Sequence, residues 1–503
     1  MSVSDPKQAQ EELMELLGHG SRELDVPRTR RVFVNRNLRM DQIELIGFDM
    51  DYTLALYHQA EMEHLSIQLT LQKLVERRGY PREILGLDYS PAWAIRGLVV
   101  DRAHGNVMKM DRHGHVGRVF HGVRELSREE RAALYRKERI RLSAERYAWI
   151  DTLFALPEAV MFLRLTEHLE QAGGEEPRWA RLWQDVHECI DEAHRDDTLK
   201  SVIRADLSRY IVSDPDLPAT LHKFRSSGKR LFVLTNSLWD YTDAVMQHLL
   251  DGKLPAYPSW RSYFDIIVVG GAKPAFFTDK NPFVQLDPAT GQPIGEPRGQ
   301  LQRGHVYQAG NLVDFEAMAR SGGDKVLYIG DHIYGDILRA KKSSVWRTAM
   351  VVQELEDELA VSERYDSRIK HLDQLDRKRR NLDAEIDFQQ LLLKSLQRLA
   401  EEGGRVVSGV PVDAAKRLAK KALDELRAAM REVSLEQDRL EDEIDRSYNP
   451  HWGPIFKEGN ENSRFGEQVE DYACLYTSRV SNFAAYSPLR YFRAPRDFMP
   501  HEK

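Results

Sequence analysis

Five short apolar runs, most of them ending in polar or charged residues, constrain the fold of this chain more than any other feature. They are "IELIGFD" (43–49), "RLFVLTN" (230–236), "DIIVVGG" (265–271), "KVLYIGD" (325–331) and "RTAMVV" (347–352). They are rich in Val, Ile and Leu and do not alternate, which is typical of parallel strands covered on both faces. Helix-like segments such as 217–228 and 334–343 lie between them. We therefore predict an α/β fold with a parallel sheet and right-handed crossovers.

Composition restricts the class of protein further. The chain has 503 residues, 42% of them hydrophobic, and only two cysteines, Cys189 and Cys474. Its start is polar and charged, without a secretory signal, so we expect a reducing cytoplasmic location and no disulfide framework. No run of about 18 apolar residues occurs, so we expect no membrane span. The formal net charge of −7, with both signs mixed along the chain, gives no broad basic surface for nucleic acid.

A separate lobe is inserted between the first two predicted strands. The gap of about 180 residues far exceeds what a simple crossover needs. The predicted catalytic core comprises 31–60 and 215–360, the lobe 61–214, and a helical extension 1–30. Within the lobe, residues 97–122 alternate short β-like runs with turn pairs, which predicts a small antiparallel meander, and the later part has helical periodicity.

The last predicted strand is followed by two further regions. Leucines and other apolar residues recur every three or four positions on both sides of "EEGGRVVSGVPVD", so 361–447 is expected to form a long antiparallel helical hairpin. Packing against the core and a contact between subunits are equally compatible with this pattern. The aromatic tail, 448–503, is expected to wrap a surface of the core.

Four polar groups follow four of the apolar runs. The carboxyl ends of parallel strands meet at one edge, which is where ligands bind in such sheets. The groups are Asp49 and Asp51; Thr235, Asn236 and Ser237; Lys273; and Asp331 with Asp336.

Three or four carboxylates at one edge repel each other unless a cation neutralises them. Mg²⁺ is the usual oxygen-ligated choice where a phosphate completes the shell. Hydroxyl and amide donors at a helix N-terminus suit phosphate oxygens, and a lysine adds charge where negative charge develops. A carboxylate can attack phosphorus to form an acyl phosphate, while a second one protonates the leaving oxygen and then activates water.

The ordered set of DxDxT, Thr-Asn, Lys and GDxxxxD resembles the haloacid dehalogenase superfamily of phosphohydrolases. The flanking residues are more closely similar to the cytosolic purine 5'-nucleotidases, the group that prefers IMP and GMP. The similarity extends from "RVFVNRNLRMDQIELIGFDMDYTLALYH" through "DTLFALPEAV", "LTNSLWDYTDAVMQHLL", "KPAFF" and "YIGDHIYGDILRAKK" to "MPHE". It covers the inserted lobe as well as the core.

This resemblance implies a role for each motif residue. Asp49 would be the nucleophile and Asp51 the general acid/base. Lys273 would stabilise the developing charge, and the phosphate would bind to Thr235, Asn236 and Ser237. Mg²⁺ would bind Asp49, the Asp51 backbone carbonyl and Asp331, with Asp336 close by or acting through water.

The resemblance also implies a base site in the inserted lobe. Asp191, His194 and Lys200 match positions of base and nucleotide contacts, and Phe154 matches a stacking aromatic. A carboxylate at Asp191 suits the ring N1–H of a 6-oxopurine. One departure is His187, where the family pattern leads us to expect arginine; a neutral histidine donates one hydrogen bond without a bidentate fork. From the residues alone, the same segment also reads as an ordinary charged helix face with Phe154 in the core.

The sequence leaves three alternative functions open. The first is an Mg²⁺-dependent 5'-nucleotidase acting on purine nucleoside monophosphates, with possible phosphotransfer to a nucleoside. The second is a related phosphatase for another phosphomonoester, and the third a non-catalytic assembly or sensor protein. Family resemblance implies a homo-oligomer, a dimer or tetramer, and a possible nucleotide effector. His104, His113, His115 and His121 read as strand and turn residues of the meander, and both cysteines as buried packing.

Overall fold

The computed structural model describes residues 26–138, 140–173, 179–333, 336, 344–496 and 498–502. The predicted N-terminal extension up to residue 25 and the helix predicted over 334–343, apart from Asp336, lie outside these residues. The chain forms two compact units: one comprises the described residues up to Asp357 and from Ile455 onward, and the other is Glu358–Pro454.

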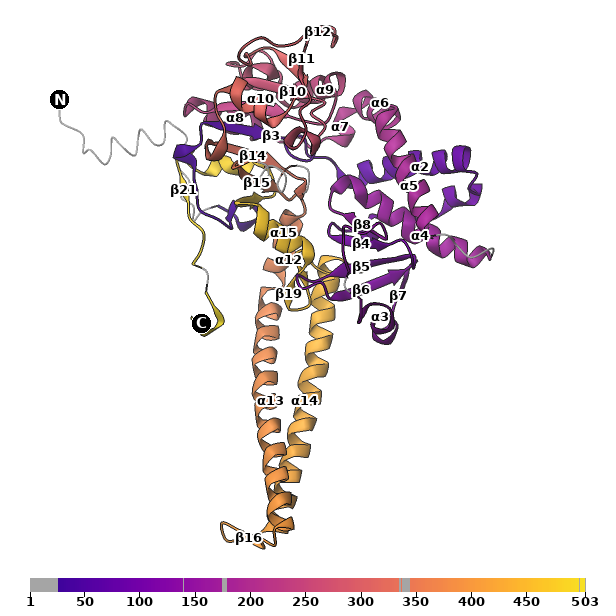
Figure 1. The fold of residues 1–503 in the computed structure, drawn as a ribbon, viewed down its shortest axis with the longest axis vertical. Coiled ribbons are helices and arrows are strands. Elements are labelled where there is room, and N and C mark those ends of the chain that lie inside the picture. The colour runs from indigo at the N-terminus through magenta and orange to yellow at the C-terminus, as the bar shows by residue number, and fades with distance from the viewer. Residues whose placement is uncertain are drawn as a thin grey trace, which may run out of the picture. The chain divides into compact units, whose positions relative to one another are not determined.

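A ten-stranded sheet forms the centre of the first unit (Figure 1). Its order is β1 (Phe33–Val34), β20 (Leu475–Thr477), β15 (Arg347–Val351), β14 (Val326–Gly330), β3 (Leu45–Phe48), β9 (Arg230–Leu234), β10 (Ile266–Val269), β13 (Val306–Ala309), β11 (Phe283–Leu286) and β12 (Pro293–Gly295). The five predicted runs are β3, β9, β10, β14 and β15, and all of them pair in parallel. The predicted α/β fold class is confirmed.

The strand order reverses at β3. From β3 the chain adds β9 and β10 on one side and later returns to add β14 and β15 on the other. A crevice opens at such a switch point, beyond the carboxyl ends of the strands, and ligands bind there. The fold therefore directs attention to the residues after β3 and β14.

Aromatic side chains fill the sheet face beside this point. Phe232 of β9 lies against Phe315 and Tyr328, with ring centroids 4.8 and 6.1 Å away. Gly47 of β3 makes room for the Phe232 ring, because a Cβ there would collide with it. This packing fixes β3, β9 and β14 relative to one another, and with them the polar residues at their ends.

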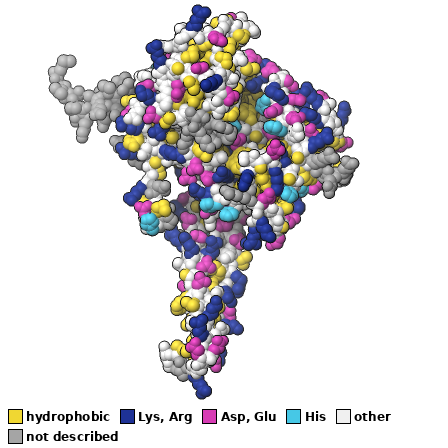
Figure 2. All heavy atoms as spheres, in the orientation of Figure 1, with side chains coloured by type: hydrophobic (Ala, Val, Ile, Leu, Met, Phe, Trp, Pro, Cys, Tyr) yellow, Lys and Arg dark blue, Asp and Glu magenta, His cyan; other side chains and the backbone are white. Residues whose placement is uncertain are grey.

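Helices cover the sheet (Figure 1). They include α8 (Leu217–Ser226), α9 (Trp239–Leu250), α10 (Leu312–Ala319) and α15 (Arg464–Tyr472), and α12 (Leu355–Arg364) follows β15. The helix predicted over 217–228 corresponds to α8. None of the described helices has the length and apolar character needed to cross a bilayer. On the visible face of this unit, acidic and basic side chains are interspersed (Figure 2).

The inserted lobe has a five-stranded antiparallel sheet and a helical layer. The sheet order is β7 (Arg124–Glu125), β6 (Val116–His121), β5 (Asn106–Met110), β4 (Leu98–Asp101) and β8 (Tyr147–Ile150). The helices are α2 (Gln59–Arg78), α3 (Arg128–Tyr135), α4 (Leu156–Ala172), α5 (Trp179–Arg195), α6 (Thr198–Ala205) and α7 (Leu207–Tyr210). Strands β4, β5 and β6 pair consecutively, which confirms the predicted meander.

The two linkers between lobe and core run side by side. The His58 N–H donates to the Tyr210 carbonyl and the Val212 N–H to the Leu56 carbonyl, each over 2.8 Å. These bonds join the start of the lobe to its end, so the two chain crossings between lobe and core, which form the hinge, lie side by side.

The second unit is a helical hairpin, as predicted. Helices α13 (Asp366–Glu401) and α14 (Val412–Tyr448) pack against each other, and the short strands β16 (Val406–Val407) and β17 (Val410–Pro411) close the turn. His371 contacts Glu436 across the pair over 2.9 Å. Leu375, Leu396, Leu423 and Val433 are buried, whereas Phe388 and Leu391 are each 63% exposed.

The C-terminal segment contributes more to the core than the predicted surface wrapping. Its strand β20 extends the central sheet in parallel with β15, and β1 pairs with β20 in antiparallel. The segment also contributes to two small antiparallel ribbons. One pairs β18 (Lys457–Glu458) with β19 (Glu461–Asn462), and the other pairs β2 (Leu38–Arg39) with β21 (Tyr491–Phe492).

Candidate active site

The end of β3 and the end of β14 bring two acidic residues together. Asp49 follows β3 directly, and its N–H donates to the Ile329 carbonyl of β14 over 2.9 Å. Asp331 follows Gly330, the last residue of β14. Because β3 and β14 are parallel neighbours at the switch point, both carboxylates lie at the same crevice.

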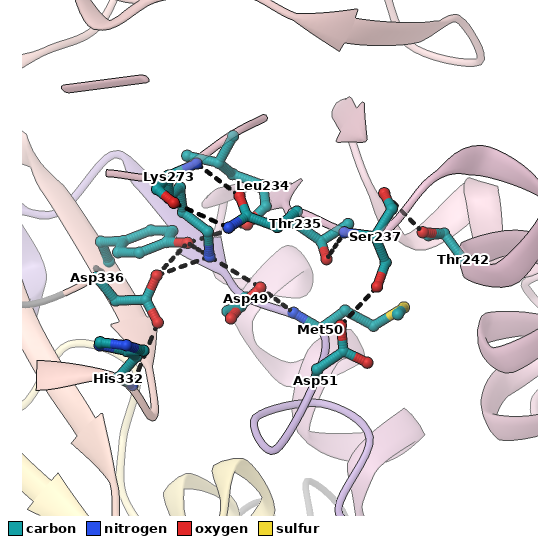
Figure 3. Close-up of polar contacts among 12 residues, drawn as sticks. Asp49, Met50, Asp51, Leu234, Thr235, Ser237, Thr242, Lys273, His332 and Asp336 are labelled. Atoms are coloured by element: carbon teal, nitrogen blue, oxygen red, sulfur yellow. Dashed lines mark hydrogen bonds and ion pairs between the residues drawn. The ribbon is translucent and has the colours of Figure 1, made fainter. Parts of the chain in front are cut away.

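Lys273 joins this acidic pair from the loop after β10. Its Nζ lies 2.9 Å from Asp49 Oδ1 and 2.6 Å from Asp336 Oδ1 (Figure 3). It also lies 2.9 Å from the Tyr328 hydroxyl. The lysine is only 8% exposed. Burial opposes its charge, but the carboxylates of Asp336 and Asp49 outweigh that effect and raise the pKa of Lys273 well above its usual value. A buried ammonium is thus held beside Asp49.

Asp49, Asp331 and Asp336 form a possible metal site. Each offers a carboxylate oxygen, and the three oxygens lie within 4.8 Å of one another. Asp331 Oδ2 is buried and has no hydrogen-bond partner among the described residues. Burial, with Asp336 and Asp49 adding to it, raises the pKa of Asp331 well above its usual value; burial likewise raises the pKa of Asp49 to about 7, against the opposing effect of Lys273. Three buried carboxylates and one lysine leave negative charge that a hard divalent cation would neutralise.

Gly330 has no side chain and so leaves space for the carboxylate of Asp336. A Cβ at this position would lie 2.5 Å from Asp336 Oδ2. Asp336 also accepts a hydrogen bond from the His332 N–H over 3.3 Å (Figure 3). The glycine before Asp331 therefore lets the Asp336 side chain approach the end of β14.

Asp51 faces a different set of partners from Asp49. Its Oδ1 accepts from the Tyr57 hydroxyl over 2.6 Å and its Oδ2 from the Ser237 hydroxyl over 2.7 Å. The Tyr57 hydroxyl also lies 2.9 Å from that of Tyr241. The second aspartate is thus oriented by hydroxyl groups from the hinge and from the turn after β9.

The three residues after β9 differ in what their side chains do. Thr235 Oγ1 accepts from the Ser237 N–H over 3.1 Å, and Ser237 Oγ binds Asp51. The Asn236 amide donates to the Lys273 carbonyl over 2.9 Å and accepts from the Lys273 N–H over 2.6 Å. These residues precede α9, whose N-terminus favours an anion. Asn236 therefore holds Lys273 in place through its side chain.

Three of the predicted lobe residues lie near Asp51. Lys200 Nζ is 3.4 Å from Ser237 Oγ and 5.1 Å from the centre of the Tyr241 ring. The Phe154 ring meets Tyr52 at 4.7 Å and His194 at 5.4 Å, both edge to face. Burial, with the charge of Lys200, lowers the pKa of His194 to about 4, so its ring is neutral at pH 7.

His187 and Asp191 lie farther along the same face of α5. His187 Nδ1 is 2.8 Å from the buried Glu158 carboxylate of α4, and its ring stacks on Trp183. The hydrogen bond to Glu158 raises the pKa of His187. Asp191 is exposed, and its charge acts on His187, Glu158 and His194.

Sequence reasoning missed the residues that orient the motif side chains. Tyr57 is 6 positions from Asp51 in the sequence, and Tyr241 is 184 positions from Tyr57. Tyr328 is 55 positions from Lys273. Only Tyr57, six residues after Asp51, lies close to its partner in the sequence.

The other histidines and the cysteines lie where expected. His113 and His115 lie in the connection between β5 and β6, where His115 Nδ1 is 3.0 Å from Asp111. His121 is in β6 and contacts Asn106 and Glu170. Cys189 and Cys474 are both buried and free. None of these residues belongs to the metal-ligand group found among the described residues.

The parallel α/β core brings DxDxT, Thr-Asn-Ser, Lys and GDxxxxD to one edge of the sheet, which is the arrangement expected from the resemblance to the haloacid dehalogenase superfamily. A sequence model of the 5' nucleotidase family matches residues 32–503, nearly the whole chain. The chain belongs to this family, and it is a phosphoric monoester hydrolase.

Known proteins are similar over long stretches. A 5'-nucleotidase domain-containing protein of Dictyostelium discoideum is 29% identical over 479 residues, which are 94% of this chain and 74% of that protein. The human 5'-nucleotidase domain-containing protein 2 is 31% identical over 343 residues, 66% of this chain and 64% of that protein. Among solved structures, CbbY of Rhodobacter sphaeroides in complex with phosphate aligns with 61% of this chain and 86% of its own, at 14% identity and a TM-score of 0.23.

Proposed function

We propose that this protein is an Mg²⁺-dependent 5'-nucleotidase that hydrolyses purine nucleoside 5'-monophosphates, IMP and GMP first, through a phosphorylated Asp49. The observation that carries the proposal is the position of Lys273 Nζ, 2.9 Å from Asp49 and 2.6 Å from Asp336. Lys273 thus pairs with two carboxylates of a three-carboxylate cluster at the edge where ligands bind. Among the described residues, the third carboxylate, Asp331, has an oxygen without a hydrogen-bond partner.

Asp49 is assigned as the nucleophile. In the part of the chain that the structure describes, its recorded side-chain contacts go to Oδ1, which accepts from the Met50 N–H over 2.7 Å and meets Lys273. We assign Oδ2 to the attack on phosphorus. The new bond joins Oδ2 to phosphorus as the bond from phosphorus to the ester oxygen breaks, giving an acyl phosphate.

Asp51 is assigned to proton transfer. Protonated Asp51 gives its proton to the leaving nucleoside oxygen, and the resulting carboxylate then takes a proton from the water that attacks the acyl phosphate. Free phosphate and the Asp49 carboxylate are regenerated. Tyr57 and Ser237, which hold both oxygens of Asp51, keep it directed at the reacting group.

The cation site fits Mg²⁺ by its donor set. Asp49, Asp331 and Asp336 offer only oxygen ligands, without cysteine or histidine. When bound, Mg²⁺ would neutralise charge on the phosphoryl oxygens. Lys273 supplies a fixed positive charge at the same place, and Thr235, Ser237 and Lys200 offer donors for the remaining phosphate oxygens.

The inserted lobe is assigned to the nucleoside. His187, Asp191 and His194 are spaced by four and three residues, so they occupy one face of α5 over about 10 Å. That length suits a nucleoside extending from the phosphate site, with Phe154 beside His194 as the stacking surface. The Asp191 carboxylate would accept from the N1–H of a 6-oxopurine, which adenine lacks.

An acyl phosphate can also be captured by an alcohol. Transfer of phosphate to a nucleoside is therefore a second expected activity of the same site. Its balance with hydrolysis depends on how well the lobe excludes water.

A substrate panel tests the proposal. Phosphate release from IMP, GMP, AMP, UMP and ribose 5-phosphate is measured with Mg²⁺ and with a chelator. We expect IMP and GMP to have the highest kcat/KM and the chelator to abolish release. Equal values for IMP and ribose 5-phosphate would refute base recognition while leaving a phosphatase. No release from any substrate would favour a non-catalytic role.

His187→Arg tests the base site separately. Arginine would restore a permanent charge and a fork of donors at this position. We expect a lower KM for GMP and an unchanged value for ribose 5-phosphate. An unchanged KM for GMP would remove His187 from the base site.

A further inference from the structure

Arg96 extends from the inserted lobe into the catalytic core, where its side chain is 0% exposed. Its Nη1 donates to the backbone carbonyl of Asp331 over 2.9 Å. Its Nε and Nη2 donate to the two carboxylate oxygens of Glu354, over 2.7 and 2.5 Å. One side chain therefore joins the start of β4 to the residues that follow β14 and β15.

The surroundings of Arg96 are shaped around its guanidinium. The Phe465 ring of α15 lies 5.0 Å from Arg96 Cζ. The next residue, Gly97, has a φ of +90°, and a Cβ there would lie 2.6 Å from Phe465 Cβ. A glycine at this position thus allows α15 to approach and its aromatic ring to cover the charge.

Arg96 contacts the backbone carbonyl of Asp331 and leaves the Asp331 carboxylate available to a cation. Asp331 Oδ2 is buried without a hydrogen-bond partner among the described residues. A guanidinium so close to an acidic residue would ordinarily form a bidentate pair with its carboxylate. Here Glu354 takes the fork instead, so Arg96 can fix the Asp331 backbone without consuming an oxygen that could bind a cation.

We propose that Arg96 is a positioning residue for the cation site: it fixes the Asp331 carbonyl from the lobe side, so that the Asp331 carboxylate is directed at Asp49 and Asp336. Glu354 orients the guanidinium for this task. This inference rests on the proposed function, because it assigns the site's Mg²⁺ affinity to a residue of the lobe.

Electrostatics and positioning predict opposite changes in Mg²⁺ affinity when Arg96 is replaced. A buried positive charge near a divalent cation repels it, so removing that charge would tighten Mg²⁺ binding if charge alone mattered. Loss of positioning lets the Asp331 loop relax and weakens binding. Groups that orient metal ligands typically contribute a factor of about 10 to 100 in affinity, so we expect positioning to dominate.

Titration calorimetry of the full-length protein with Mg²⁺ alone tests this. We expect Arg96→Met to raise the Kd for Mg²⁺ by about 10- to 100-fold. Arg96→Lys, which keeps the charge but loses the fork, should give a smaller rise. Glu354→Gln should also weaken binding, because the guanidinium loses the carboxylate that orients it.

A kinetic measurement separates positioning from general damage. For Arg96→Lys we expect the Mg²⁺ concentration at half-maximal rate to rise, with kcat at saturating Mg²⁺ recovering toward wild type. Arg225→Met is the matched control, since Arg225 likewise binds a carboxylate, Asp265, and a backbone carbonyl, that of Tyr263. Asp265 precedes β10, at the opposite edge of the sheet from Asp49. The control should lose stability and keep its Mg²⁺ affinity.

The outcomes distinguish the two levels of the account. Unchanged or tighter Mg²⁺ binding in folded Arg96→Met would overturn the inference. Where that variant does not fold, unchanged binding in Arg96→Lys and Glu354→Gln would overturn it equally. A wild-type protein that binds no Mg²⁺ would overturn the proposed function and this inference together.

Discussion

Asn236 and Lys273 hold each other through two reciprocal hydrogen bonds: the Asn236 amide donates to the Lys273 carbonyl over 2.9 Å and accepts from the Lys273 N–H over 2.6 Å. The pair links the end of β9 to the loop after β10. It fixes the backbone from which the Lys273 side chain reaches Asp49.

Asn236→Ala should therefore act through Lys273. We expect kcat to fall by about tenfold or more, because a small displacement of a charge-stabilising group is costly, with a smaller change in KM. Lys273→Met should lose more, since the charge itself is gone. Asn311→Ala is the control, because Asn311 is a buried asparagine that caps α10. An equal loss of kcat in that control would contradict the assignment.

Gly330→Ala should disturb the acidic cluster. The added Cβ would lie 2.5 Å from Asp336 Oδ2, so the carboxylate has to move. We expect a loss of about 1 to 3 kcal/mol in unfolding free energy and weaker Mg²⁺ binding. Gly86→Ala is the control, since a Cβ there meets nothing within 4 Å. Normal Mg²⁺ affinity in Gly330→Ala, measured by calorimetry, would show that Asp336 does not need its present position.

Glu63 of α2 should make stability depend on pH. It is 2% exposed, and its Oε2 has no partner among the described residues. Burial raises its pKa from 4.5 to about 7, against the hydrogen bond from Gln59. Because the folded protein then binds this proton more tightly than the unfolded chain, the stability from protonated Glu63 is present below about pH 4.5 and is lost as pH rises through about 7.

Glu63→Gln should remove that dependence, since glutamine stays neutral. Between pH 5 and 8 the unfolding free energy of the variant should rise relative to wild type, by at most about 3 kcal/mol. Urea unfolding at both pH values measures this difference. The exposed Glu76 of the same helix supplies the control, Glu76→Gln. Parallel pH profiles for wild type and Glu63→Gln would contradict the prediction.

We propose that the hairpin forms a subunit contact, one of the two roles that its sequence pattern leaves open. Phe388 and Leu391 of α13 are each 63% exposed, which suits a covered apolar face. We expect light scattering to give the mass of two or four chains, and Phe388→Glu with Leu391→Glu to lower it. Ser395→Glu, at an exposed polar position of the same helix, should leave the mass unchanged. An unaltered mass in the double variant would place the subunit contact elsewhere.

The core of the fold could be predicted because its strands are locally encoded. Each of the five parallel strands is a short apolar run, and the polar residue after it marks the carboxyl edge. Asp49, Lys273 and Asp336 were expected at this edge, and Lys273 Nζ lies 2.9 Å from Asp49 and 2.6 Å from Asp336.

Other strands were missed because their sequences do not identify them. Strand β13, "VYQA", mixes polar and aromatic residues, and β20, "LYT", has three residues in a segment read as a surface tail. Both become strands by pairing with β10 and β15, which a single segment does not encode.

The orienting residues of the site were missed for the same reason. Arg96 and Glu354 are 258 positions apart, and Tyr57 and Tyr241 are 184 apart. Only the folded chain brings them together. The reacting groups could be recognised by their motif spacing, whereas the groups that hold them in place could not.

Phosphoryl transfer to Asp49 is the central claim, and trapping the acyl phosphate tests it most directly. Protein quenched during turnover of IMP is reduced with borohydride, and the peptide containing residue 49 is analysed by mass spectrometry. The account predicts homoserine at position 49, with no reduced residue and no turnover in Asp49→Asn. Reduction at another carboxylate, or phosphate release by Asp49→Asn at a rate near wild type, would contradict it.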